Sequence, residues 1–208
     1  MKVVLWRHGR TGHNAAGLWQ GQLDVPMDET GIEQAKRAAA ALHEKYGTSI
    51  VRLVSSDLKR ALATAEALGE RTGLSVTPDA RLREVAVGSW QGITRAEIVQ
   101  RGEGEVYAAW RRGENVRAGG EKGETRQEAA TRGAAAILDA VEGLVAGQTV
   151  VVTSHGAVLK GAILQLIGAG VDAWTTFIGM TNASWVVLEP DGDRWLVAER
   201  DCVADDLI

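Results

Sequence analysis

Residues 3–9 read Val3-Val4-Leu5-Trp6-Arg7-His8-Gly9, an apolar β-prone run that stops at once at an arginine and a histidine. Such a run, ending in a polar segment with glycines, predicts a buried strand that feeds a loop. Residues 149–156 repeat the arrangement as Thr149-Val150-Val151-Val152-Thr153-Ser154-His155-Gly156. Continuous β-branched runs are typical of strands covered on both faces, as in parallel sheets. The two runs therefore predict two central strands, each with a histidine just beyond its end.

Helix and strand patterns alternate along the rest of the chain. Capping-box spacings and glycines mark the helix ends, and short apolar runs mark the strands. The expected elements, in chain order, are a helix from Thr30 to about Tyr46, a strand at Ile50–Val54, a helix capped by Asp57 and ending at Gly73, a short strand near Leu74–Thr77, a short helix from Thr94, a mobile loop at Arg111–Gly123, an Ala-rich helix from Thr125 to about Gly147, an apolar helix to about Ile167, and a hairpin of Ser184–Glu189 with Arg194–Glu199. This alternation predicts an α/β fold, a single three-layer domain over residues 1–208 with a mostly parallel central sheet and helices on both faces.

Length and composition restrict the class of protein. The 208 residues fit one compact domain, and 23 Lys and Arg against 27 Asp and Glu give a net charge of −4. This balance offers no basic field, so neither nucleic acid nor a membrane surface is an expected partner. One cysteine excludes an intramolecular disulfide, and no apolar run is long enough for a signal peptide or a membrane span. We expect a cytoplasmic protein with a small-molecule ligand, either a monomer or a homodimer.

Charged side chains follow three of the expected strands. The carboxyl ends of parallel strands form a common ligand-binding edge, so Arg7, His8, Arg60 and His155 are expected to converge there. A phosphate monoester is a dianion, whose transfer needs a nucleophile and positive charge around the phosphoryl oxygens. Neutral His8 supplies the nucleophile if a backbone carbonyl of residues 9–14 holds one ring nitrogen. Arg7, Arg60 and protonated His155 supply the charge that a metal ion provides elsewhere, so neither metal nor cofactor is expected.

Glu84 is the acid that this chemistry requires. It lies in a glycine- and tryptophan-containing loop after the expected third strand, and one carboxyl group can protonate the leaving alkoxide and later deprotonate the attacking water. Each residue alone has an ordinary structural explanation: Arg60 as a solvated charge on a helix, or Glu84 as a surface ion pair with Arg83. Two arginines, two histidines and an acid that all follow strands favour phosphoryl transfer.

Longer motifs that contain these residues carry a resemblance to a known family. The motifs are Leu5-Trp6-Arg7-His8-Gly9-Arg10-Thr11-Gly12-His13-Asn14, Gln20-Gly21-Gln22-Leu23-Asp24, Ser55-Ser56-Asp57-Leu58-Lys59-Arg60-Ala61, Leu82-Arg83-Glu84 and Ser154-His155-Gly156. In this order, over nearly the whole chain, they resemble the histidine phosphatase superfamily, also called phosphoglycerate-mutase-like. The resemblance implies that fold, a phosphohistidine intermediate and the roles given above. It adds Asn14, Gln20, Gly21 and Gly156 as substrate-binding residues.

Two other functions remain open. A cofactor-dependent phosphoglycerate mutase would use the same phosphohistidine, but mutases of this family usually carry a long insertion after the Glu84 loop. Here the 39 residues 85–123 separate Glu84 from Glu124, which favours hydrolysis. A catalytically inactive phosphate-binding or scaffolding protein on the same fold would normally have lost a reactive residue. A metal site of His8, His13 and His155 is disfavoured because no acid stands at ligand spacing beside His13.

The substrate expectation rests on a narrower resemblance. Trp90-Gln91-Gly92 and Asn182-Ala183-Ser184-Trp185 are most similar to actinobacterial phosphatases acting on glucosyl-3-phosphoglycerate. We expect residues 107–122 to cover the mouth of the site, where one arginine would hold a substrate carboxylate. The candidates are Arg111, Arg112 and Arg117, whereas Trp19, Trp90, Tyr107 and Trp110 are equally compatible with pocket and core positions.

Overall fold

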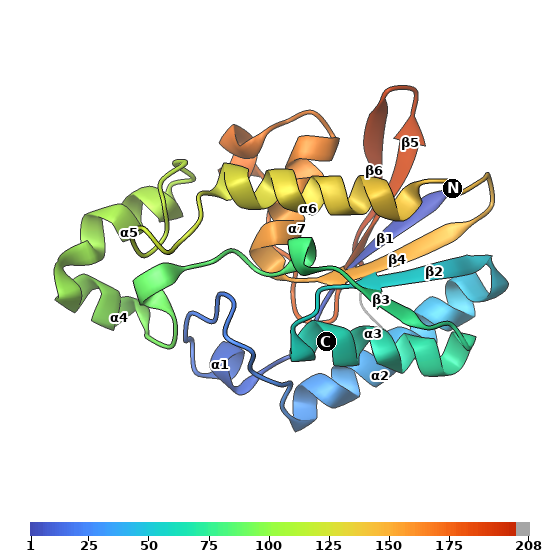
Figure 1. Ribbon diagram of the computed structural model, residues 1–208, viewed down its shortest axis with the longest axis horizontal. Coiled ribbons are helices and arrows are strands. Elements are labelled where there is room, and N and C mark those ends of the chain that lie inside the picture. Colours follow the sequence, from blue (N-terminus) through green and yellow to red (C-terminus); the bar gives the residue numbers. More distant parts are fainter. Residues whose placement is uncertain (203–208) are drawn as a thin grey trace.

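The computed structural model describes residues 1–202, without the side chains of 201 and 202, and centres on one six-stranded sheet (Figure 1). The strand order is β3-β2-β4-β1-β5-β6. The strands are β1 (Lys2–Arg7), β2 (Ile50–Ser55), β3 (Val76–Pro78), β4 (Thr149–Ser154), β5 (Trp185–Asp191) and β6 (Arg194–Cys202). Strands β1 to β4 are parallel, and the C-terminal hairpin adds β5 antiparallel to β1 and β6 antiparallel to β5. The predicted mostly parallel α/β sheet is confirmed.

Helices cover both faces of the sheet. Helices α2 (Glu29–Tyr46) and α3 (Lys59–Thr72) lie on one face, and α6 (Arg126–Val141) and α7 (Gly156–Leu166) lie on the other (Figure 1). Side chains of β1 alternate between the two layers because successive residues of a strand point to opposite faces. Val3 and Leu5 join the core under α6 and α7, whereas Val4 and Trp6 join the core under α2 and α3. All four are fully buried, which fixes β1 and the residues that follow it.

Glycines bring α6 and α7 close together. A Cβ at Gly133 would lie 2.8 Å from Val158, and a Cβ at Gly161 would lie 2.9 Å from Ala130. The absence of these two Cβ atoms allows the helices to pack along their length, which determines where the first turn of α7 meets the edge of the sheet. Two amides of that first turn donate to the Glu84 carboxylate.

An extension beyond the carboxyl edge of the sheet has a small core of its own. It contains the 3-10 turn Gly88–Trp90, α4 (Arg95–Ile98), a π-helical turn at Val99–Glu103 and α5 (Gly104–Arg111). Trp90, Tyr107 and Trp110 are buried there, with ring centroids 5.7 Å apart for Trp90 and Tyr107 and 6.2 Å apart for Trp90 and Trp110. Trp90 and Tyr107 are therefore core residues. Smaller elements elsewhere are α1 (Gly12–Ala15) and the 3-10 turns Gly47–Ser49, Ala80–Leu82 and Val171–Thr176.

Two predicted helix caps are wrong. Helix α2 is capped by Asp28, whose Oδ1 accepts from the Gly31 amide at 2.8 Å, so Thr30 lies inside the helix. Asp28 is also held by an ion pair with Arg10, a contact that spans 18 positions and leaves no local signal. Asp57 does not cap α3, because its carboxylate pairs with Arg83 instead.

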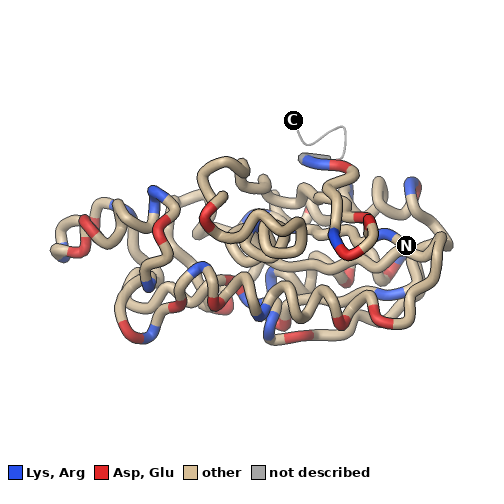
Figure 2. Tube along the Cα trace, turned by 90° about the horizontal axis from the view of Figure 1, so that it is seen from above, with Lys and Arg blue, Asp and Glu red and all other residues tan. Residues whose placement is uncertain are grey.

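Residues 111–123, expected to be a mobile loop, are in part packed. Ala118 is fully buried, and the Gly119 carbonyl accepts from the Ser89 amide at 2.9 Å. Acidic and basic residues are interspersed over the trace (Figure 2), so a cluster of one sign is a local feature of a site. Among the described residues, none of the helices has the length and apolar character that crossing a bilayer requires.

Candidate active site

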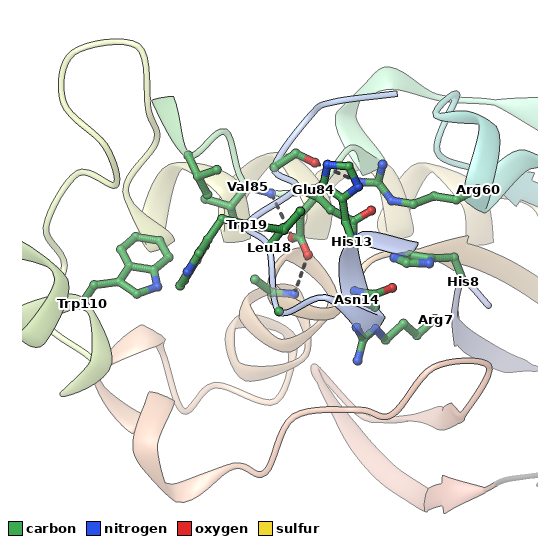
Figure 3. A pocket seen from close by; sticks show the side chains of 15 residues that line it. Arg7, His8, His13, Asn14, Leu18, Trp19, Arg60, Glu84, Val85 and Trp110 are labelled. Atoms are coloured by element: carbon green, nitrogen blue, oxygen red, sulfur yellow. Dashed lines mark hydrogen bonds between the residues drawn. The ribbon is translucent and has the colours of Figure 1, made fainter. Parts of the chain in front are cut away.

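A cavity of about 260 Å³ opens at the carboxyl edge of the sheet (Figure 3). Segments distant in sequence line it: the end of β1, the 13–21 loop, the start of α3, the loop at residues 84–87 and the first turn of α7. Arg7, His8, Arg60 and Glu84 all face this cavity. The structure thus brings together four of the five predicted catalytic residues, as expected for residues that follow the carboxyl ends of parallel strands.

His8 has one ring nitrogen occupied and the other available. Its Nδ1 lies 2.7 Å from the Gly9 carbonyl oxygen, which can only accept, so Nδ1 carries the proton and donates it. The predicted backbone partner is therefore confirmed, and Nε2 keeps its lone pair. Burial, followed by the charges of Arg7 and Arg60, holds the pKa of His8 well below its usual value. The ring is neutral near pH 7 and able to attack an electrophile.

Arg7 lies against the N-terminus of α7. One Nη1 hydrogen is donated to the Met180 carbonyl, and Nε is buried without a partner among the described residues. A Cβ at Gly156 would come within 3.4 Å of the guanidinium, so glycine at this position makes room for the arginine. Burial lowers the pKa of Arg7, and nearby Glu84 opposes that shift. Arg7 thus offers unused N–H groups to an anion.

Arg60, which lines the pocket, forms a buried pair with His155, which lies behind it. Arg60 is 1% exposed, and its guanidinium donates to the carbonyls of Gly21 and Leu23 at 2.8 and 2.7 Å. Its Nε donates to His155 Nδ1 at 3.2 Å. Because an arginine N–H only donates, His155 Nδ1 must be an acceptor, and the ring proton lies on Nε2, 2.9 Å from Ser56 Oγ.

The expected protonated His155 is wrong for the protein without substrate. Burial first, and then the charge of Arg60, holds the pKa of His155 well below its usual value, so the ring is neutral. His155 is fully buried and does not line the cavity, although its ring centroid lies 5.0 Å from that of His8. Its direct contacts are with Arg60, Ser56 and His8.

Glu84 is fixed by backbone donors. Oε1 accepts from the amides of Val85 and Val158 at 2.9 and 3.1 Å, and Oε2 accepts from the Ala157 amide at 3.2 Å. Two of these donors belong to the first turn of α7, whose N–H groups have no partner within the helix. The carboxyl group is therefore oriented toward the pocket by the helix end, as Figure 3 shows. The alternative of a surface ion pair with Arg83 is wrong, since Arg83 pairs with Asp57.

The remaining predicted binding residues occupy different places. Asn14 and Gln20 line the cavity. The Asn14 oxygen accepts from the Thr11 backbone amide at 3.2 Å and the Gln20 oxygen from the Thr11 hydroxyl at 3.0 Å, so their side-chain N–H groups remain available as donors. Gly21 lines it too, with its carbonyl bound to Arg60. Gly156 lies instead in an adjoining cavity beside Arg7.

Two of the three arginines expected to read a carboxylate are turned away. Arg112 pairs with Glu114 at 2.7 Å, and Arg117 pairs with Glu128 at 2.6 Å. Only Arg111 of the three lines a cavity next to the site. Arg112 and Arg117 point away from the site because each is paired with an acid that is close in the sequence, 2 and 11 positions further on.

Two residues for which the sequence predicted no contact with the catalytic residues support the site. Arg132 donates to the carbonyls of Arg83 and Glu84 at 2.6 and 3.0 Å and pairs with Glu124 at 2.7 Å, which fixes the Glu84 loop. Asn182 donates to the His8 carbonyl at 3.1 Å. These contacts join positions 48 and 174 residues apart, so no local pattern marks them. Within residues 1–202, no group of three His, Cys, Asp or Glu side chains forms a candidate metal site.

The family model of the histidine phosphatase superfamily (branch 1) matches residues 3–202. The chain therefore belongs to this superfamily. It is a phosphatase, an enzyme that hydrolyses phosphoric monoesters, which sets aside the alternative of an inactive protein on the same fold.

Individual phosphatases are similar to this chain over most of its length. The chain is 40% identical over 212 residues to a glucosyl-3-phosphoglycerate phosphatase of Mycolicibacterium vanbaalenii, with 95% of this chain and 90% of the relative covered. It is 32% identical over 205 residues to a metal-independent phosphoserine phosphatase of Arabidopsis thaliana, at 93% and 80% coverage. A mycobacterial glucosyl-3-phosphoglycerate phosphatase in complex with VO3 superposes with a TM-score of 0.85 at 37% identity, covering 94% of this chain and 96% of that one. The predicted family and fold are confirmed.

Proposed function

We propose that the enzyme hydrolyses its substrate in two steps, through a phosphoryl group carried on His8. In the first step Nε2 forms a bond to phosphorus, the bond from phosphorus to the ester oxygen breaks, and Glu84 protonates the leaving alkoxide. In the second step water attacks phosphorus, Glu84 takes its proton, and the bond to nitrogen breaks to release inorganic phosphate. The observation that carries this proposal is the neutral His8 ring with its free Nε2 in a cavity shared with Glu84.

Positive charge around the nucleophile replaces a metal ion. Arg7 and Arg60 both line the cavity and both lower the pKa of His8, so their charges act at the position of the incoming phosphoryl group. The amide groups of Asn14 and Gln20 add neutral donors. His155 acts through its contacts with Arg60 and the His8 ring. The name of the Arabidopsis relative, a metal-independent phosphatase, supports a metal-free reaction.

Glucosyl-3-phosphoglycerate is the proposed physiological substrate. The support is 40% identity to a phosphatase named for this compound and the aromatic lining of the site. Trp19 and Trp110 line both the catalytic cavity and the adjoining one, where Trp174 joins them. Tryptophan combines a large apolar face with a hydrogen-bond donor, which suits a sugar ring.

A phosphate-release panel tests this function. We expect kcat/KM to be highest for glucosyl-3-phosphoglycerate among that compound, 3-phosphoglycerate, phosphoserine and glucose 6-phosphate. His8→Ala should abolish release from all of them, whereas His13→Ala, which changes another histidine of the same cavity, should keep turnover. Release by His8→Ala near the unmodified rate would refute the mechanism, and equal kcat/KM across the panel would refute the substrate.

A mutase has a distinct product. Incubation with 3-phosphoglycerate and 2,3-bisphosphoglycerate should give free phosphate and no 2-phosphoglycerate. Formation of 2-phosphoglycerate faster than phosphate would assign the chain to the mutases.

A further inference from the structure

A second cavity, of about 530 Å³, adjoins the catalytic one. The two share Arg7, Trp19, Glu84, Trp110 and Ala157, so they form one continuous cleft. A molecule whose phosphoryl group lies at His8 therefore has room to extend into the second cavity.

Three cations besides Arg7 line the second cavity. Arg111 ends α5, Arg126 begins α6, and Lys160 lies in the middle of α7. Lys160 interrupts an apolar helix between Leu159 and Gly161, and it is only 9% exposed. Among the described residues none of the three forms an ion pair with an acidic side chain, and the only acid lining this cavity is Glu84, which three backbone amides hold.

Arg126 is placed where a cation is unfavourable. It is 2% exposed and is the first residue of α6, at the positive end of the helix dipole. Its guanidinium stacks between Trp110 and Trp174, 3.9 and 4.3 Å from the ring centroids. The terminal nitrogens donate to the carbonyls of Trp110 and Glu114, whereas Nε is buried with no partner within the described part of the chain.

The three cations repel one another in the absence of an anion. Burial, and then the charges of Arg126 and Arg111, lowers the pKa of Lys160 to about 8. Burial, and then the charge of Arg111, lowers the pKa of Arg126 to about 10. Arg126 and Lys160 are buried and Arg111 is exposed. Two buried cations close to a third raise the free energy of this part of the protein, and a bound anion would offset that cost.

We propose that Arg111, Arg126 and Lys160 form a second anion-binding site, which receives an acidic group carried on the alcohol part of the substrate. This inference rests on the proposed phosphatase function and adds the substrate class: a phosphoester with a carboxylate or a second phosphate beyond the one removed. Trp110 and Trp174 cover the part of the substrate that joins the two acidic groups.

Paired substrates separate the two chemistries of the remote group. One pair is glucosyl-3-phosphoglycerate and its methyl ester, and the other is fructose 1,6-bisphosphate and fructose 6-phosphate. We expect kcat/KM to favour the more anionic member of one pair by about tenfold to a hundredfold, the size of one charge-assisted hydrogen bond. Preference in the first pair identifies a carboxylate, and preference in the second identifies a phosphate.

Two variants and a matched control locate the effect. Lys160→Met and Arg111→Met keep an unbranched side chain without the charge, and each should lower the preferred pair's ratio by about tenfold. Arg112→Met removes the neighbouring arginine, which pairs with Glu114 outside the cleft, and should keep the ratio. Ratios below threefold in both pairs for the unmodified enzyme, or an unchanged ratio in both Lys160→Met and Arg111→Met, would overturn the proposal.

A binding measurement separates this proposal from the catalytic one. Calorimetry on His8→Ala with the same pairs should give the same preference without turnover, again reduced by Lys160→Met. If the unmodified enzyme releases no phosphate from any substrate, the proposed function fails, and calorimetry alone decides the anion site. If phosphate is released but neither kinetics nor calorimetry shows a preference, the anion site alone is refuted.

Discussion

Replacing Glu84 by glutamine should separate its role as a proton donor from its role as a structural acceptor. The carboxyl group accepts three backbone hydrogen bonds, two at Oε1 and one at Oε2. A glutamine oxygen at the Oε1 position keeps the amides of Val85 and Val158, but its NH2 group then faces the Ala157 amide. One buried donor is left without an acceptor, at a cost of about 1–3 kcal/mol in the free energy of unfolding.

The catalytic effect should depend on the leaving group. Loss of a general acid slows proton transfer by about 10² to 10⁴-fold, so kcat/KM for alkyl phosphates should fall by that factor. For p-nitrophenyl phosphate kcat/KM should fall far less, because nitrophenolate leaves with little protonation. Water activation is still impaired, so this substrate should give a burst of nitrophenolate equal to the enzyme present, followed by slow turnover.

The assay is therefore kcat/KM on both substrates together with stopped-flow detection of the burst. Thermal unfolding measures the structural loss separately, at about 2–4 °C for each kcal/mol. Equal losses of kcat/KM on both substrates, with no burst, would show that Glu84 is not the acid.

Three further predictions follow from other parts of the structure. The pKa values of His8 and His155 are lowered, so below about pH 6.5 the unfolded chain binds more protons than the folded protein. The free energy of unfolding should therefore decrease as the pH falls below that value. A free energy of unfolding that stays constant down to pH 5 in urea titrations would contradict this prediction. Chelation with EDTA should leave phosphate release intact, whereas a loss restored by one specific metal would contradict the role of Arg7 and Arg60. Gly31→Ala should cost about 1–3 kcal/mol in thermal unfolding, because its Cβ would lie 1.9 Å from the Arg10 carbonyl oxygen; an unchanged melting temperature would contradict that contact.

Strand ends were the most predictable part of the site. The β-branched run before Ser154 and the apolar run before Arg7 marked two parallel strands, and the carboxyl edge of a parallel sheet brings their following residues together. Partners chosen over long distances were not predictable. Asp57 had the local spacing of a helix cap, yet the structure pairs it with Arg83, 26 positions away.

The sequence gives only part of the information needed to predict the second anion-binding site of Arg111, Arg126 and Lys160. Lys160 is a lysine within an apolar helix, and Arg126 is a cation in the first turn of a helix, but neither position predicts a site by itself. The proximity of Arg126 and Lys160 depends on how α6 packs against α7, which the glycines at 133 and 161 permit. Sequence periodicity fixes the buried face of each helix but not the axial position of one helix along another.

The most direct test of the central claim is to identify the residue that carries phosphate during turnover. The enzyme is mixed with substrate, quenched in alkali, digested and analysed by mass spectrometry, since phosphohistidine survives base and is lost in acid. We predict one phosphorylated peptide, with the phosphate on the imidazole of His8 and none on His13 or His155. Phosphate on another residue, or turnover in rapid-quench samples with no phosphorylated enzyme at any time, would contradict the account.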